Sequence, residues 1–199
     1  MSNEIKKDTV SIIFGDSLAY GLHDKEYGGW VSRLRIHMDN YCANNYVINL
    51  AIPGQTSNEI LNRMDEEINN RYNDVDDFVL IFSFGIKDSL LLNEDSNYIN
   101  IFKENINKII TKSRKYTNKI YFVGLIKPNI DIEKRKIYNI DNVIKIDKCL
   151  ENICTNNNTK YIRLIDSINK DILSDGLHPN SLGHKIIYEK ILKEIYNKK

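Results

Sequence analysis

Residues 10–21, VSIIFGDSLAYG, are the stretch that most limits what this chain can fold into. An apolar run rich in β-branched residues stops abruptly at Gly15, which predicts a buried strand over residues 9–14. Ser17 follows at once, and in open α/β sheets ligands bind at the carboxyl ends of the strands. A serine in such a place is more often a turn or helix-capping residue. A catalytic role for Ser17 therefore depends on partners elsewhere in the chain.

The composition is that of an ordinary globular protein. Of the 199 residues, 42% are hydrophobic and 28% are charged, which is enough for one domain with a large core. We expect this domain to span residues 1–199, because no linker, repeat or low-complexity stretch divides the chain. The net charge of +1 argues against a nucleic acid or a membrane surface bound through bulk charge. No apolar run approaches the length of a membrane span.

The cysteines and the first residues favour a reducing compartment. Cys42, Cys149 and Cys154 are odd in number and form no CxxC pair, so we expect buried thiols. Residues 1–9 contain no apolar run, and we therefore expect no secretory signal and a cytoplasmic protein. The four histidines are not spaced with the cysteines as zinc ligands, and GxGxxG and GxxxxGK motifs are absent from the sequence. We expect neither a metal nor a cofactor.

Apolar runs and amphipathic stretches alternate along the chain. This alternation predicts an α/β fold, a parallel sheet with helices on both faces. For five strands the commonest order is the flavodoxin-like 2-1-3-4-5, which gives a three-layer αβα sandwich. Strands are expected at residues 9–14, 45–50, 77–84, 119–126 and 160–165. Helices are expected at residues 29–41, 56–70, 97–116, 138–155 and 181–196, and irregular segments at 15–28, 85–88 and 128–133.

This strand order would bring three distant chain segments together at one edge of the sheet. The first strand would lie between the second and the third, so the strand ends that carry Ser17, Gly54 and Lys87 would be neighbours. Gly54 stands just before a capping box formed by Thr56 and Glu59, near the unpaired N–H groups of a helix N-terminus. The N–H groups of Ser17 and Gly54 are therefore candidate donors to an oxyanion, and a side chain of the Lys87 loop is a third.

Asp175 and His178 are the residue types that a serine nucleophile needs as partners. The hydroxyl group needs a base, and the base needs a third group to fix its tautomer. Asp175 lies three residues before His178, just ahead of the last expected helix, where its carboxylate could orient one ring nitrogen. An Asp-x-x-His pair arises by chance in roughly a third of chains of this length, and its ordinary explanation is an exposed loop. His23 and His184 are the alternative bases.

These motifs resemble those of the SGNH (GDSL) hydrolase family of serine esterases and lipases, over almost the whole chain. Residues 15–18, GDSL, look like the nucleophile block, and a specified tetrapeptide arises by chance in about one chain per thousand of this size. Gly54 looks like the second block, which supplies a backbone oxyanion donor in the family. Residues 85–88, GIKD, stand where the family has Gly-x-Asn-Asp. Residues 175–179, DGLHP, are similar to the last block, which carries the Asp and His of the triad, and residues 27–30, YGGW, look like the start of the first helix in bacterial members.

The resemblance implies a flavodoxin-like fold and the hydrolysis of esters or thioesters without a cofactor. Ser17 would attack the acyl carbon, His178 would pass the proton to the leaving group, and Asp175 would orient His178. The substrates would be small acyl esters, thioesters or acetylated sugars.

Other side chains near these strand ends are assigned from their position alone. We expect Leu18, Tyr20 and Tyr27 to shape an acyl pocket, because they follow the nucleophile in the same loop. We expect Asp16 and Asp88 to hold loop amides by hydrogen bonds rather than to take part in catalysis.

Lys87 departs from the family pattern, because it replaces an asparagine whose amide donates to the oxyanion. Its ammonium group could make a charge-assisted bond to the oxyanion, turn away to solvent or a nearby carboxylate, or bind an anionic group of the substrate. Losing one donor typically costs about 2.7–4 kcal/mol of transition-state stabilisation. The departure motivates an alternative function, a weakly active or non-catalytic binding module on an SGNH scaffold. The intact Ser17, Asp175 and His178 argue against that alternative.

Overall fold

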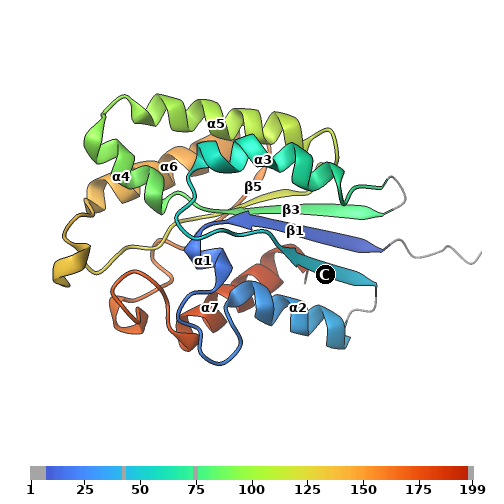
Figure 1. The fold of residues 1–199 in the computed structure, drawn as a ribbon, viewed down its shortest axis with the longest axis horizontal. Helices are drawn as coiled ribbons and strands as arrows, with labels where there is room; N and C mark the ends of the chain where they lie inside the picture. Colours follow the sequence, from blue (N-terminus) through green and yellow to red (C-terminus); the bar gives the residue numbers. More distant parts are fainter. Residues whose placement is uncertain (1–7, 42–43, 74–75, 197–199) are drawn as a thin grey trace, which may run out of the picture.

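A computed structural model describes residues 8–41, 44–73 and 76–196 of the chain. Five parallel strands form one sheet in the order β2-β1-β3-β4-β5, so the predicted topology is confirmed (Figure 1). The strands are β1 (Thr9–Gly15), β2 (Asn45–Asn49), β3 (Asp77–Ser83), β4 (Ile120–Val123) and β5 (Lys160–Ile162).

Helices cover both faces of the sheet and complete the three layers (Figure 1). One face carries α3 (Ser57–Asn69), α4 (Ile86–Glu94), α5 (Tyr98–Ser113) and α6 (Ile140–Asn156). The other face carries α2 (Trp30–Tyr41) and α7 (Ser181–Ile191), and α7 continues into a π-helical turn, Leu192–Tyr196. The remaining helices are short: α1 (Ser17–Tyr20) and the 3₁₀ turns η1 (Glu133–Arg135) and η2 (Lys170–Ile172). No helix in the described residues is both long and apolar enough to cross a membrane.

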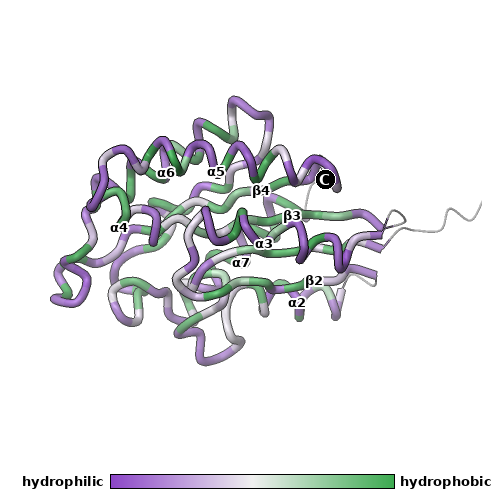
Figure 2. The backbone as a smooth tube through the Cα atoms, turned by 45° about the horizontal axis from the view of Figure 1, so that its top comes forward, coloured by the Kyte–Doolittle hydropathy of each residue, from purple (hydrophilic) through white to green (hydrophobic). Residues whose placement is uncertain are grey.

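The sheet separates two hydrophobic clusters, because successive side chains of a strand point to opposite faces. Ile12 and Phe14 of β1 pack with α3, α5 and α6, whereas Ile13 packs with α2 and α7. Phe82 stacks on Phe14 at 5.6 Å and on Phe122 at 5.0 Å, which links β1, β3 and β4. Figure 2 shows the resulting pattern, with hydrophobic strands inside and more hydrophilic segments outside. Burial on both faces explains why the central strands read as continuous apolar runs.

Two helices occupy segments that the sequence pattern assigned to loops. At Gly85, φ is +128°, and this left-handed residue turns the chain from β3 directly into α4. Asp16 caps the four-residue helix α1 by accepting a hydrogen bond from the Leu18 N–H at 2.9 Å. Neither segment is long enough for helical periodicity to separate it from a loop, so both helices were missed. The ends of β4 and β5 were also predicted too long, by three residues each.

Hydrogen bonds join the ends of β1, β2 and β3 at one edge of the sheet. The Asp16 N–H donates to the Ser83 carbonyl at 3.1 Å, which fixes the turn that carries Ser17 against β3. The Ile52 N–H donates to the Gly15 carbonyl at 3.0 Å, which brings the turn after β2 alongside. The α3 capping box is present as predicted, because Glu59 accepts from the Thr56 N–H at 2.8 Å and Thr56 from the Glu59 N–H at 3.4 Å.

The loop between α1 and α2 is fixed from two directions. Asp24 is buried and accepts hydrogen bonds from the N–H of Gly29 at 3.1 Å and from Arg33 Nε at 2.8 Å. Burial alone would raise the pKa of Asp24, but hydrogen bonds from Arg33 and from the N–H groups of Tyr27 and Glu26 hold its pKa well below the usual range. His184 is buried and bonds the Leu22 carbonyl at 3.0 Å through Nε2. His184, on α7, thus has a structural role in holding this loop.

The two cysteines in the described residues are buried thiols, as expected. Burial raises the pKa of Cys149 and raises that of Cys154 to about 12, so both are protonated at neutral pH. Cys42 lies outside the described residues.

Candidate active site

The fold brings Ser17 close to His178 and Asp175, although Ser17 lies near the other end of the sequence. Ser17 begins α1 at the end of β1, and His178 precedes α7. Ser17 Oγ lies 2.9 Å from His178 Nε2, within hydrogen-bonding distance. The other ring nitrogen, Nδ1, lies 3.1 Å from Asp175 Oδ2. A hydroxyl, an imidazole and a carboxylate in this order form the arrangement that activates a serine nucleophile.

The turn between Asp175 and His178 orients the imidazole. Asp175 Oδ1 accepts the N–H groups of Leu177 at 3.0 Å and His178 at 2.9 Å, which folds the segment back on the carboxylate. Gly176 has φ of +84°, a conformation that a side chain would strain. The same carboxylate therefore holds both the backbone and the ring of His178.

Opposing effects set the charges of this pair. Burial alone would raise the pKa of Asp175, but hydrogen bonds from His178 and Leu177 hold its pKa well below the usual range. Arg135 adds an ion pair to Asp175 Oδ2 and a hydrogen bond from Nε to the Asp175 carbonyl at 3.1 Å. Burial lowers the pKa of His178 below its ordinary value despite the nearby Asp175. An ionised Asp175 beside a neutral His178 is the protonation state that a general base requires at neutral pH.

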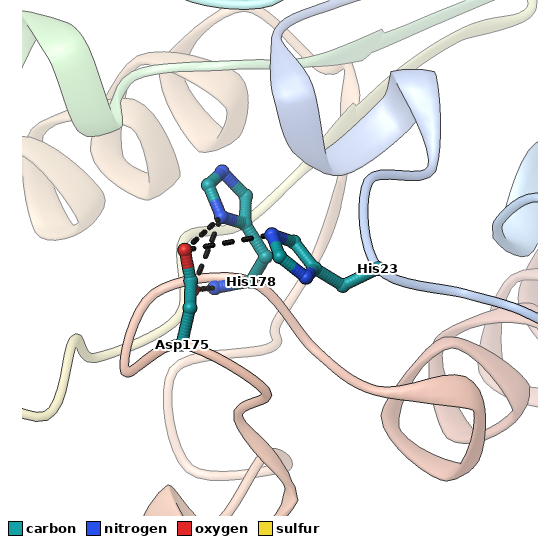
Figure 3. Close-up of side chains that lie close together, drawn as sticks. All are labelled: His23, Asp175 and His178. Carbon is teal, nitrogen blue, oxygen red and sulfur yellow. Dashed lines mark hydrogen bonds and ion pairs between the residues drawn. The ribbon is translucent and has the colours of Figure 1, made fainter.

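A second imidazole, that of His23, packs on the first (Figure 3). Its ring lies 5.3 Å from the ring of His178 at an interplanar angle of 18°. Its Nε2 atom lies 3.5 Å from Asp175 Oδ2. Within the described chain, these three residues form the one group whose ligand atoms are close enough for a shared metal ion, within 4.8 Å of one another. Nearly parallel rings do not aim their nitrogen lone pairs at one point, and Arg135 already pairs with Asp175. The arrangement thus fits ring packing better than metal binding.

The predicted oxyanion donors lie on turns beside Ser17. Among the described residues, the N–H groups of Ser17 and Gly54 have no hydrogen-bond acceptor. Gly54 has φ of +79°, and its exposed turn is tied to the end of β1 through Ile52. Lys87 is exposed on the first turn of α4. The hydrogen bonds of Thr56 and the charge of Lys87 lower the pKa of Glu59.

A small apolar cavity opens beside Ser17 and His178. Leu18 lines it, in agreement with the expectation, but Tyr20 and Tyr27 do not. Tyr20 is 52% exposed, because residues two apart on a helix point in opposite directions. Tyr27 is 50% exposed and lies under the Arg33 guanidinium at 4.3 Å. Neither tyrosine therefore contacts this cavity, and their assignment to an acyl pocket stays a prediction without structural support.

Sequence reasoning missed most of the side chains that line this cavity. They come from the segments that follow β3 and β4 and from the turn before His178. A signal was available for them, because each directly follows an apolar strand or stands within the DGLHP motif. They are Phe84, Ile86, Leu125, Ile126 and Leu177.

Asp16 and Asp88 are structural, as expected. Asp16 caps α1, whereas Asp88 accepts hydrogen bonds from the Ser57 hydroxyl at 2.6 Å and the Tyr98 hydroxyl at 2.8 Å. Burial raises the pKa of Asp88. Burial also raises the pKa of Asp16 to about 7, against the opposing hydrogen bond from Leu18.

Comparisons with known proteins show the family of the chain and its fold. The model of the GDSL-like lipase/acylhydrolase family matches residues 13–186, so the chain belongs to this family. A lipase/acylhydrolase from Enterococcus faecalis shares the fold with a TM-score of 0.74 at 19% identity, over 96% of this chain and 98% of the other. The esterase EstA from Pseudoalteromonas sp. matches with a TM-score of 0.74 at 19% identity, over 94% and 97% of the two chains. A catalytic mutant of an acetylxylan esterase from Geobacillus stearothermophilus matches with a TM-score of 0.75 at 14% identity, over 96% of each chain. No curated protein matches the chain.

The buried carboxyl group of Asp16 makes stability depend on pH in a predictable direction. Because its pKa rises from 3.8 to about 7 on folding, the folded state binds more protons between these values. Stability from this group is thus lost as the pH rises from 4 to 7, by roughly 4 kcal/mol in all. Asp16→Asn keeps an acceptor for the Leu18 N–H and removes the titration. We expect the unfolding free energy of Asp16→Asn to increase relative to that of the wild type between pH 4 and pH 8, measured by urea denaturation.

The control is Asp39→Asn, which removes one exposed negative charge from α2. If the difference in unfolding free energy between Asp16→Asn and the wild type stays constant from pH 4 to pH 8, the raised pKa assigned to Asp16 is contradicted.

Proposed function

We propose that this protein is a serine esterase that cleaves small carboxylic esters or thioesters through an acyl-enzyme. The observation that carries the proposal is the Ser17 Oγ to His178 Nε2 distance of 2.9 Å, with Nδ1 of the same ring bonded to Asp175. Membership of the GDSL-like lipase/acylhydrolase family supports the same class of reaction.

In the first half of the reaction, His178 acts as a base and then as an acid. Neutral His178 takes the proton of Ser17 through Nε2 while Oγ forms a bond to the acyl carbon. The resulting imidazolium is stabilised by the carboxylate of Asp175, which accepts a hydrogen bond from the Nδ1–H group. The tetrahedral intermediate then collapses, and His178 gives its proton to the departing alkoxide or thiolate. The acyl group remains on Ser17 as an ester.

In the second half, a water molecule replaces the leaving group. His178 takes a proton from the water as its oxygen attacks the acyl-enzyme carbonyl. Collapse of the second tetrahedral intermediate breaks the bond to Ser17 Oγ, which recovers its proton from His178. The products are a carboxylic acid and the regenerated enzyme.

Two backbone groups are assigned to the oxyanion. The N–H groups of Ser17 and Gly54 have no acceptor among the described residues, and the Ile52 N–H ties the Gly54 turn to the end of β1, which supports this assignment. Lys87 remains the candidate for a third donor. Its side chain is exposed on the first turn of α4, so its ammonium group is solvated in the substrate-free protein.

The pH dependence of hydrolysis tests the role of His178. Because the base must be neutral and burial lowers its pKa, kcat/KM for p-nitrophenyl acetate should fall on the acid side with a midpoint below about 6.5. His178→Ala should lower kcat by a factor of about 10⁴ or more. The matched control is His37→Ala on α2, whose imidazole bonds Tyr188 and lies outside the site. Activity like that of the wild type in His178→Ala would contradict the mechanism.

The alternative function, a binding module that has lost turnover, rests on Lys87 alone. Replacing Lys87 by asparagine restores the amide found in the family. If two backbone donors suffice in the wild type, Lys87→Asn should retain at least the wild-type kcat and gain up to about 100-fold. The control Lys87→Ala removes the charge without adding a donor. A collapse of kcat in both variants would instead show that the ammonium group takes part in the reaction.

A further inference from the structure

The cavity beside Ser17 is nearly filled by its own walls. Leu18 comes from α1, Ile86 from the start of α4, Ile126 from the segment after β4, and Leu177 from the turn before His178. The centre of a water-sized sphere can occupy only about 20 Å³ of this space. A site for one water molecule needs about 10–15 Å³ on the same measure. The cavity therefore has room for a group of one or two heavy atoms.

Buried hydrogen bonds hold the inner wall in place. The Leu125 N–H donates to Asp147 Oδ1 at 2.8 Å, and the same oxygen accepts the Tyr161 hydroxyl at 2.7 Å. Gly124 packs so tightly that a Cβ atom there would lie 2.5 Å from that hydroxyl oxygen. The wall cannot recede without breaking a hydrogen bond to a buried carboxylate, which is costly.

The chemistry of the lining selects an uncharged, apolar group. Apolar side chains supply most of the surface, and the polar lining residues are Asp16, Ser17, Ser83 and His178. Asp16 is engaged with the Leu18 N–H. In the described residues, Ser83 Oγ is buried and has no hydrogen-bond partner. A carboxylate group in this space would lose its hydration without gaining an ion pair.

We propose that this cavity is the acyl pocket and that its size restricts the enzyme to acetyl esters. The inference rests on the proposed function, because it concerns the group that becomes attached to Ser17. The methyl group of an acetyl ester fills the available space. A butanoyl or hexanoyl chain requires Ile86, Ile126 or Leu177 to move away. These three side chains thus determine the acyl specificity.

The test compares p-nitrophenyl acetate, butyrate and hexanoate, which share one leaving group. The wild type should show kcat/KM for the hexanoate at least about 100-fold below that for the acetate, since single methylene groups in a tight pocket already change specificity by about 10-fold or more. In Ile126→Ala, the ratio of kcat/KM for the hexanoate to kcat/KM for the acetate should rise at least about 10-fold. Both values come from one preparation, so partial unfolding of the variant does not alter the ratio.

The matched control is Ile130→Ala, which truncates an isoleucine four residues further along the same segment. Ile130 is 40% exposed and does not line the cavity. Its ratio should equal that of the wild type.

The possible outcomes distinguish the size limit, the assignment of the acyl pocket and the proposed function. Hydrolysis of the hexanoate at or above the acetate rate in the wild type would overturn the size limit and leave the esterase function standing. An unchanged ratio in Ile126→Ala would overturn the assignment of this cavity as the acyl pocket. Turnover of none of the three esters would overturn the proposed function, and the acyl pocket with it.

Discussion

The hydrogen bond between Ser17 and His178 depends on how the parallel sheet orders its strands. Ser17 lies at the end of β1, and β1 is held between β2 and β3 along its length. The backbone bonds from Asp16 to Ser83 and from Ile52 to Gly15 then fix the turns that leave these strands. Because these contacts are between main-chain groups of a rigid sheet, they place the hydroxyl group without relying on any flexible side chain.

Two aspartates near Ser17, the partly buried Asp175 and the buried Asp16, show how local hydrogen bonding decides the charge of a carboxyl group. Asp175 accepts hydrogen bonds from the backbone and the ring of His178 and from the Leu177 N–H, so its pKa stays low and it remains a carboxylate. Asp16 is more completely enclosed, and burial outweighs its bond to Leu18, which raises its pKa to about 7. The first supplies the negative charge that an imidazolium needs. The second caps a helix and contributes no fixed charge below neutral pH.

Much of the architecture could be predicted from local pattern. The strands β1 and β3 are apolar because both faces are covered, and the capping residues of α3 are visible as Thr56 and Glu59. The order of the strands followed from the frequency of one topology, and it correctly placed β1 between β2 and β3. The short α1 and the start of α4 escaped prediction, because each depends on a single capping or left-handed residue, Asp16 or Gly85. The packing of His23 on His178 had no sequence signal, since it is set by a loop folded through Asp24 and His184.

The account stands on Ser17 being activated in the folded protein, and covalent modification measures this directly. A fluorophosphonate reacts with an activated serine hydroxyl and releases fluoride, leaving a stable phosphonyl adduct. We expect the intact mass of the wild type to increase by one adduct, with peptide mapping that assigns it to Ser17 and with no adduct in Ser17→Ala. An unmodified wild-type protein, or an adduct that persists in Ser17→Ala, would contradict the account.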